Sequence, residues 1–171
     1  MRQFFMEETF KVIYPLLTVL NTVLIVTGLL YTIRHYRFNR TWSYIERYNS
    51  SDFLLTKKYV KMFTNQLNSF ENDNQRKEYV KRLIDSTKDN DIEMILHLTR
   101  YVNLFTELGV AYKSGAWSKK AIISIAAVVI SSWDKMETFI RVEQERALPR
   151  KIYNSFEDLY KIVKRKGLHE K

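Results

Sequence analysis

Hydrophobic and polar positions divide the chain into one long apolar run and a series of shorter amphipathic segments. Residues 12–33 hold no Asp, Glu, Lys or Arg across 22 positions. A helix needs about 20 such residues to cross a hydrocarbon core of roughly 30 Å. Pro15 lies near the start of the run, where a missing helical donor matters least. The pattern therefore predicts one transmembrane helix over residues 12–33.

Two other interpretations of this run compete with the transmembrane one. A buried helix of a soluble protein would usually carry a charge within this length. A cleaved secretory signal has an apolar core of about 7–15 residues followed by a small-residue cleavage site. Here the run is longer, no A-x-A pattern is present, and the residues that follow are Arg34, His35, Tyr36 and Arg37. We therefore expect the helix to remain as an anchor.

The charges that flank the run predict its orientation. Before it, Arg2 and Lys11 are opposed by two glutamates. After it comes a group of arginines, which are Arg34, Arg37, Arg40 and Arg47. Positively charged segments stay on the cytoplasmic side of a membrane. We expect a single-pass protein of the inner (cell) membrane, with its N-terminus outside, residues 34–171 in the cytoplasm and the arginines against anionic lipid headgroups.

Beyond the run, apolar residues recur at helical spacing and no stretch alternates as a strand would. Helices are predicted over residues 34–48, 52–70, 76–84, 91–113, 119–146 and 153–166. The fold class is therefore all-α, with one N-terminal transmembrane helix that continues into a cytoplasmic helical bundle. We expect four parts, namely a short external N-terminus (1–11), the transmembrane helix (12–33), a basic membrane-proximal helix (34–50) and the bundle (51–171).

Capping and terminating residues mark several of the expected helix ends. Ser51 and Ser118 are suited to cap the helices that follow them. Gly115, Pro149 and Gly167 each come at or just after the end of a periodic segment, where glycine and proline stop helices. These signals set the boundaries of the expected helices.

Two apolar patterns indicate the core of the bundle. The expected helix 91–113 carries a stripe that includes Ile92, Ile95, Leu96, Leu98, Val102, Phe105, Leu108 and Ala111. Residues 121–133 carry no charge, but this run is too short to span a bilayer. We expect a buried core helix there, and a membrane-dipping or oligomer-forming segment is the alternative.

Chemistry-bearing residues are sparse in this sequence. The chain has no Cys, so neither a disulfide framework nor a thiolate metal site is available. Phosphate-binding, nucleophile and metalloprotease motifs are missing. Glu93 and His97 share a helix face, but a metal site needs a further ligand, so a solvated or capping histidine is the simpler interpretation. We expect no catalytic residue, metal or cofactor. The net charge of +9 is spread along the chain, and no recognition motif indicates sequence-specific nucleic acid binding.

Arg100, Asn103 and Glu107 form the most distinctive polar set outside the apolar run. They lie at i, i+3 and i+7 along one side of the expected helix 91–113. Near a buried stripe they could form a network across the bundle that reads a ligand or an interface. The simpler interpretation is a solvent-facing set with complementary Arg and Glu charges.

The apolar run itself has a polar face. At 100° per residue, Thr18, Asn21, Thr22, Gly28 and Thr32 fall within about 120° of one another. Lipid offers no partner for the Asn21 amide, and Gly28 would let two backbones approach closely. Because no other run is long enough to span, we expect this face to support self-association into a homo-oligomer.

Several short motifs occur in an order that resembles a known family. They are Arg40-Thr41-Trp42, Ser51-Asp52-Phe53, Asn103 with Phe105 and then Gly115, Trp133 with Phe139 and Ile140, and Tyr153 followed by Phe156-Glu157-Asp158-Leu159. Over about residues 34–166 this order resembles the domain-of-unknown-function 4760 family of short single-pass bacterial membrane proteins. The family's acidic position falls on Thr106, with Glu107 beside it, so a role tied to that acid does not carry over. The family has no established activity, and the resemblance implies architecture alone.

Taken together, these patterns favour a function without catalysis. The first hypothesis is a membrane-anchored, non-enzymatic helical protein that oligomerises and binds a protein or a small ligand through its cytoplasmic bundle. The alternative is a membrane effector of a bacterial antiphage defence system, gated by a cytoplasmic signal such as an anionic nucleotide. A basic cytoplasmic domain and a polar-striped span suit this second hypothesis. An enzyme with an unrecognised all-α site is the least favoured of the three.

Overall fold

The computed structural model describes the chain except for residues 1, 118, 149 and 166–171, and it does not describe the side chains of residues 2–12, 38, 41, 119 and 120. Three expected helix-boundary residues, Ser118, Pro149 and Gly167, therefore lie outside the described residues. The side chains of Arg2 and Lys11, which entered the orientation argument, lie outside them as well.

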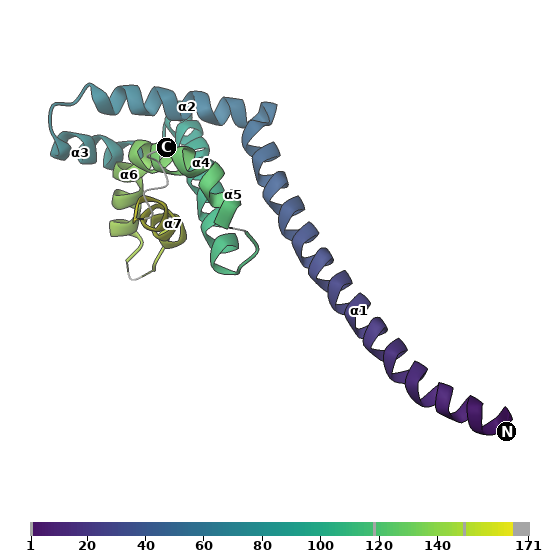
Figure 1. Cartoon of the computed structure of the whole chain (residues 1–171). Helices are drawn as coiled ribbons and strands as arrows, with labels where there is room; N and C mark the ends of the chain where they lie inside the picture. Colours follow the sequence, from purple (N-terminus) through teal and green to yellow (C-terminus); the bar gives the residue numbers. More distant parts are fainter. Residues whose placement is uncertain (1, 118, 149, 166–171) are drawn as a thin grey trace. The chain divides into compact units, whose positions relative to one another are not determined.

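Every regular element in the described part of the chain is an α-helix (Figure 1). The helices are α1 (Arg2–Asn49), α2 (Ser51–Asn68), α3 (Asp73–Ile84), α4 (Asp89–Lys113), α5 (Lys119–Ser124), α6 (Ala126–Arg146) and α7 (Asn154–Arg165). The chain divides into two compact units, Met1–Asn39 and Arg40–Lys171. The all-α prediction is confirmed, and the last turns of α1 belong to the second unit.

Helix α1 contains the apolar run. Among the described residues it is the one helix long and apolar enough to cross a membrane, and no residue of its most apolar window is buried. The run expected to span a membrane is thus helical, and its large apolar side chains are exposed in the described structure. The helix also extends back to Arg2, so Pro15 lies inside it.

The starts of α2 and α3 differ from the predicted ones. Ser50, not Ser51, caps α2, because its hydroxyl oxygen accepts a hydrogen bond from the Phe53 amide at 3.3 Å. Helix α3 begins at Asp73 instead of residue 76, because the Asn72 side chain accepts from the Gln75 amide at 2.9 Å. In both places a short polar side chain, located before the predicted helix start, accepts a hydrogen bond from one of the first free backbone amides.

Helix α4 ends as predicted, but the predicted burial of the apolar residues near its N-terminus is wrong. Lys113 is its last residue, and Gly115 follows with φ of 70°, a conformation that favours glycine. Ile92 and Leu96 are 42 % and 65 % exposed, although the periodicity placed them in the core. The reason is that the first turns of α4 use other positions for packing, with His97 stacked on Tyr59 of α2 at 4.4 Å.

The single helix expected over residues 119–146 is broken in two. Ile125 has φ and ψ of −111° and 8°, which separates α5 from α6. Several β-branched residues surround the break, and such residues restrict the helical backbone. The Ser124 hydroxyl donates to the Ala121 carbonyl at 2.7 Å, which offers the backbone a non-helical alternative.

The uncharged run 121–133 contributes to the core, as expected. Ile122, Ala126, Val129 and Trp133 are all at most 2 % exposed, whereas Ile123 is 47 % exposed. One face of α5 and α6 is therefore buried in the core, and residues on the other face are exposed.

Helix α4 is the centre of the bundle, because it packs against α2, α3, α6 and α7. Its closest approach is to the start of α7 at Gly109, where a Cβ atom would collide with the carbonyl group of Ser155. A buried hydrogen bond links α4 to α6, with the Tyr101 hydroxyl 2.7 Å from that of Ser132. Burial raises the pKa of Tyr101, so this hydroxyl remains protonated and available for the bond.

Candidate functional site

A cavity of about 360 Å³ lies within the unit Arg40–Lys171. The last turns of α1, the middle of α4 and the α5–α6 break form it, and its walls include Tyr44, Tyr48, Leu104, Phe105, Leu108, Trp117, Ile125 and Val128. Small-molecule sites have volumes of about 300–1,000 Å³ and are mostly apolar. The cavity is at the small end of that range and has the expected lining.

Contacts with neighbouring side chains hold the Tyr48 ring of the cavity wall in place. The Tyr48 ring packs against Phe53 and Phe105, with ring centroids 5.6 and 6.1 Å apart. The Lys57 ammonium lies 3.6 Å from the centre of the same ring, in a cation–π contact. Because the ring of Tyr48 is fixed from three sides, the wall that it forms is present before any ligand enters.

Trp117 gives the cavity wall a polar group without a partner. The residue is 4 % exposed and its ring meets Tyr44 edge to face, with centroids 5.7 Å apart. Its indole N–H is buried and has no hydrogen-bond acceptor in the described structure. A buried donor left unsatisfied costs about 1–3 kcal/mol, and no group in the described structure offsets this cost at Trp117.

No charged residue is among those that line the cavity. The nearest ion pair on the helices that form it joins Arg47 to Glu107, whose Nη1 and Oε2 atoms are 2.8 Å apart. Both side chains are more than two-fifths exposed, and an exposed pair of this kind contributes about 0–1 kcal/mol. The cavity itself therefore suits an uncharged ligand, and an anionic nucleotide finds no complementary charge inside it.

The polar set on α4 is not assembled into a site. Arg100, Asn103 and Glu107 are all exposed, and Glu107 is used in the pair with Arg47. The cavity takes its α4 residues from the adjacent face, at Leu104, Phe105 and Leu108. The structure thus places the three polar residues on the solvent side of the helix that lines the cavity.

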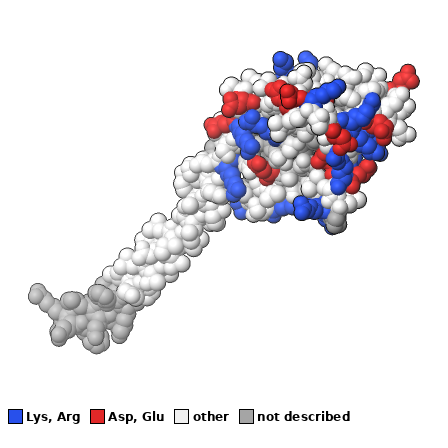
Figure 2. Space-filling model, turned by 180° about the vertical axis from the view of Figure 1, so that it is seen from behind, with Lys and Arg blue, Asp and Glu red and all other residues white. Residues whose placement is uncertain are grey.

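The membrane-proximal arginines are distributed over both units. Arg34 and Arg37 belong to the first unit and Arg40 and Arg47 to the second, and all four side chains are exposed. Figure 2 shows basic and acidic side chains intermingled over the folded unit, whereas the described apolar stretch of α1 carries neither. The arginines directly after the apolar stretch are therefore on the surface of the described units.

Within α1, the polar face of the apolar run is less uniform than its residue types suggested. The hydroxyls of Thr18, Thr22 and Thr32 each donate to the carbonyl four residues earlier, at 2.8–2.9 Å. Asn21 makes no side-chain hydrogen bond within the described structure, and Gly28 has no atom within 4 Å of a Cβ position. Asn21 is thus the one member of the expected set whose polar atoms still need a partner.

Glu93 and His97 do not form part of a metal site. His97 Nδ1 lies 3.0 Å from the hydroxyl of Thr56, which is fully buried on α2. Among the described residues, no group of three or more His, Cys, Asp or Glu side chains is placed to hold a metal ion. His97 therefore serves to satisfy a buried hydroxyl.

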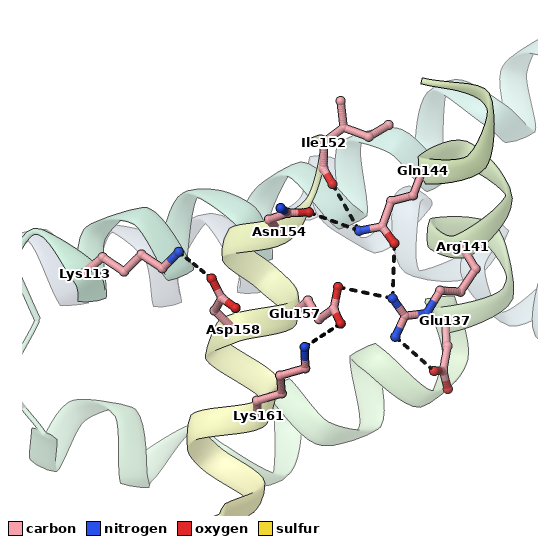
Figure 3. A network of polar contacts seen from close by, with 9 residues as sticks. All are labelled: Lys113, Glu137, Arg141, Gln144, Ile152, Asn154, Glu157, Asp158 and Lys161. Atoms are coloured by element: carbon pink, nitrogen blue, oxygen red, sulfur yellow. Dashed lines mark hydrogen bonds and ion pairs between the residues drawn. The ribbon is translucent and has the colours of Figure 1, made fainter. Parts of the chain in front are cut away.

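A network of ion pairs fixes α7 against the rest of the bundle (Figure 3). Glu157 on α7 accepts from Arg141 of α6 at 3.2 Å and from Lys161 at 2.7 Å, and Asp158 pairs with Lys113 of α4. Partial burial raises the pKa of Glu157, but the hydrogen bond from Lys161 and the charge of Arg141 outweigh it, so the pKa lies below the usual value. All members have protein partners, which indicates a structural role.

The buried aromatic residues of three of the short motifs meet in the core. The Trp133 ring of α6 is 5.2 Å from that of Phe156 on α7, and Phe156 stacks on Phe105 of α4 at 5.0 Å. Phe139 and Ile140 are also fully buried. Residues from three distant parts of the sequence thus form one aromatic cluster, so these motifs specify packing.

Comparison with known proteins identifies the family of the chain. A family model described as "Domain of unknown function (DUF4760)" matches residues 16–163. No curated protein and no solved structure matches the chain. Since the match covers both the apolar run and the helices that carry the aromatic cluster, the chain belongs to the DUF4760 family.

Proposed function

We propose that this DUF4760 protein is a membrane-anchored, non-enzymatic module that self-associates through its membrane helix and binds a small, uncharged, largely apolar ligand in the unit Arg40–Lys171. The observation that carries the proposal is the complete exposure of the apolar run on α1. The cavity beside Trp117 supports the ligand class.

The exposed run needs an apolar environment. Its large side chains range from 47 % exposed at Ile13 to 70 % at Tyr31. Soluble monomers rarely expose contiguous apolar patches of more than a few hundred Å². A bilayer covers such a helix on all sides, and the arginines that follow it favour a cytoplasmic location for the second unit.

The chemistry of the cavity supports binding without catalysis. Its lining has no carboxylate, amine or imidazole among the described residues, so it offers no general acid or base near neutral pH. The apolar walls favour an alkyl or aromatic body. The buried indole N–H of Trp117 would donate to a carbonyl oxygen of the ligand once the ring turned to expose it. A neutral ketone, ester or amide with a short apolar body fits this description.

Membrane anchoring is tested by placing charge inside the run. Leu20→Arg combined with Leu24→Arg should release the full chain from membranes on alkaline carbonate extraction, because each central arginine costs about 2.5–3.5 kcal/mol. The matched control is Leu54→Arg with Met62→Arg, which charges two exposed apolar residues of α2. The control should stay in the membrane pellet. Release of the unaltered chain, or equal release of both double variants, would contradict the proposal.

Ligand binding is tested by filling the cavity. The medium-chain ketone 2-undecanone should raise the melting temperature of the full chain in lipid nanodiscs, since binding to the native state stabilises it. Val128→Trp, which inserts a ring into the cavity, should abolish the rise, and Ile123→Trp at an exposed position should keep it. Undecane, which lacks the carbonyl, should give a smaller rise. An equal rise in melting temperature for the parent and for Val128→Trp would show that the ketone binds outside this cavity.

A further inference from the structure

The apolar run of α1 carries a row of regularly spaced residues along one face of the helix, here called the seam. Positions spaced alternately four and three residues apart are Tyr14, Thr18, Asn21, Ile25, Gly28, Thr32 and His35. This spacing averages 3.5 residues, the repeat of a left-handed coiled coil. At 100° per residue these seven positions lie within about 100° of one another. Val23 and Leu30 lie on the opposite side of the helix.

Most of the seam needs no polar partner. The Thr18 and Thr32 hydroxyls donate to the carbonyls of Tyr14 and Gly28, at 2.9 and 2.8 Å. These threonines therefore present small side chains whose donors are already satisfied. Small, internally satisfied side chains are what membrane helix interfaces favour, because they allow close packing.

Between Thr18 and Thr32, Asn21 is the seam residue whose polar side-chain atoms lack a partner in the described structure. Its amide offers two donors and one acceptor, and its side chain has no hydrogen bond in the described part of the chain. Burial of an unpaired amide in hydrocarbon is unfavourable. The described residues contain one helix able to span a membrane, so no second span among them supplies the partner.

A second copy of the chain supplies a reciprocal partner for Asn21. In a parallel pair each seam residue lies opposite itself, so Asn21 meets Asn21, and each amide can both donate and accept. An antiparallel pair that overlaps along the whole seam brings Asn21 near Gly28, which has no side chain to bond. The parallel register also places Gly28 opposite Gly28, where no atom lies within 4 Å of a Cβ position and the backbones can approach.

We propose that two copies of this protein associate as a parallel, left-handed pair of membrane helices through the seam from Tyr14 to His35. The two Asn21 amides bond to each other and set the register, as a single buried asparagine does in coiled coils. Two copies are enough, because two Asn21 amides can each donate one hydrogen bond to the other and accept one from it. This inference rests on the proposed insertion of α1 into the membrane.

Disulfide cross-linking tests the seam directly, because the chain has no native cysteine. Single variants Thr18→Cys and Thr32→Cys of the full chain, oxidised in native membranes, should each form a covalent dimer. The controls Val23→Cys and Leu30→Cys should not. An antiparallel pair would cross-link only when Thr18→Cys and Thr32→Cys are co-expressed, and that result would overturn the parallel register. Cross-linking of the controls in place of the seam variants would overturn the seam.

The role of Asn21 and the number of copies are measured by sedimentation equilibrium in detergent. The parent chain should sediment with the mass of a dimer, and a larger assembly would contradict the pair. Asn21→Leu should weaken association about 3- to 30-fold, the range measured for hydrogen bonds between membrane helices. Leu30→Asn, which adds an amide to the opposite side, should not restore it when combined with Asn21→Leu.

Failure of this inference is distinguishable from failure of the proposed function. If carbonate extraction leaves the parent in the membrane but no seam variant cross-links, the anchor stands and the parallel pair is wrong. If the parent is extracted, the membrane anchor itself is wrong.

Discussion

The same residue types have different surroundings in the apolar stretch of α1 and in the bundle formed by α2–α7. Gly28 on α1 is open to its surroundings, whereas Gly109 on α4 lies against the backbone of Ser155. Thr22 satisfies its hydroxyl on its own helix, whereas Thr56 is fully buried and uses His97 of a different helix. The first region depends on what surrounds the molecule, and the second depends on its own packing. A substitution should therefore have different consequences in the two regions.

The largest expected contrast comes from the same change at two valines. Val129→Asp buries an unpaired carboxylate at a position that is 0 % exposed and should destabilise the bundle by about 3–5 kcal/mol. That loss is a large part of the total stability of a domain. Val23→Asp should leave the melting of the bundle unchanged and reduce membrane insertion. Thermal melts of the purified full chain, together with carbonate extraction, separate the two effects. A normal melt for Val129→Asp would contradict the assigned core.

The two glycines give the next contrast. Gly109→Ala forces α4 and α7 apart, because its Cβ would overlap the carbonyl group of Ser155, and over-packing of this kind costs about 1–3 kcal/mol. Gly28→Ala meets no atom of the same chain and should not change the melting of the bundle. Chemical denaturation of both variants measures the difference. Equal midpoints would show that α7 does not approach α4 as closely as described.

A hydroxyl deletion should have a similar or smaller effect. Tyr101→Phe leaves the Ser132 hydroxyl buried without its 2.7 Å partner, at a cost of about 1–3 kcal/mol. Thr22→Val is the matched change in α1, where the lost bond is internal to one exposed helix. Only the first should lower the melting temperature of the bundle. Tyr101→Phe combined with Ser132→Ala should recover part of the loss, since no polar group is then left unpaired.

Glu157 predicts a pH-dependent contrast within the bundle. Its pKa is lower in the folded protein than the ordinary value of 4.5, so its ion pairs stabilise the fold fully above about pH 4.5 and are lost as the pH falls through the lowered pKa. Glu157→Gln should cost about 1 kcal/mol at pH 7, and the difference from the parent should vanish at low pH. Denaturation midpoints at several pH values test this. A difference that persists below the lowered pKa would point to packing instead of charge.

The smallest effect is expected for the pair that ties the end of α1 to α4. Arg47→Ala removes an ion pair between two side chains that are 44 % and 46 % exposed, which should cost at most about 1 kcal/mol. Glu107→Ala should cost the same, and the double variant should cost no more than either single change. A clearly larger loss would mean that residues 40–49 depend on this pair for their docking.

Periodicity predicted the helices because each of them buries one regular stripe. The buried Leu98, Val102 and Phe105 all follow from the helical spacing of the stripe on residues 91–113. The same reasoning failed at Ile92 and Leu96, since it cannot tell which of two adjacent apolar faces meets a neighbour. It also failed at Ile125, where the β-branched residues and Ser124 were present in the sequence but were not weighed against a continuous helix.

The candidate site was less predictable than the fold. Arg100, Asn103 and Glu107 were predicted as a candidate site because they are polar and lie beside an apolar stripe. The cavity lies instead on the adjacent face of α4, where its lining residues are Leu104, Phe105 and Leu108. Trp117 carries no sequence signal for an unsatisfied donor, because that property arises from the packing around it. Gly109 is similar, since its close contact with Ser155 joins residues 46 positions apart. By contrast, the seam on α1 is visible in the sequence, because it depends on one helix alone.

Helix α7 has a consequence for the order of events during synthesis. It supplies Phe156, Leu159 and Val163 to the core, and it packs on both α4 and α6. The aromatic cluster around Trp133 therefore cannot close until the last part of the described chain has been made. Helix α1, in contrast, is made before the bundle. If α1 is the proposed membrane anchor, it can enter the membrane while the bundle is still incomplete, and the aromatic cluster then closes on a chain that is already held at the membrane.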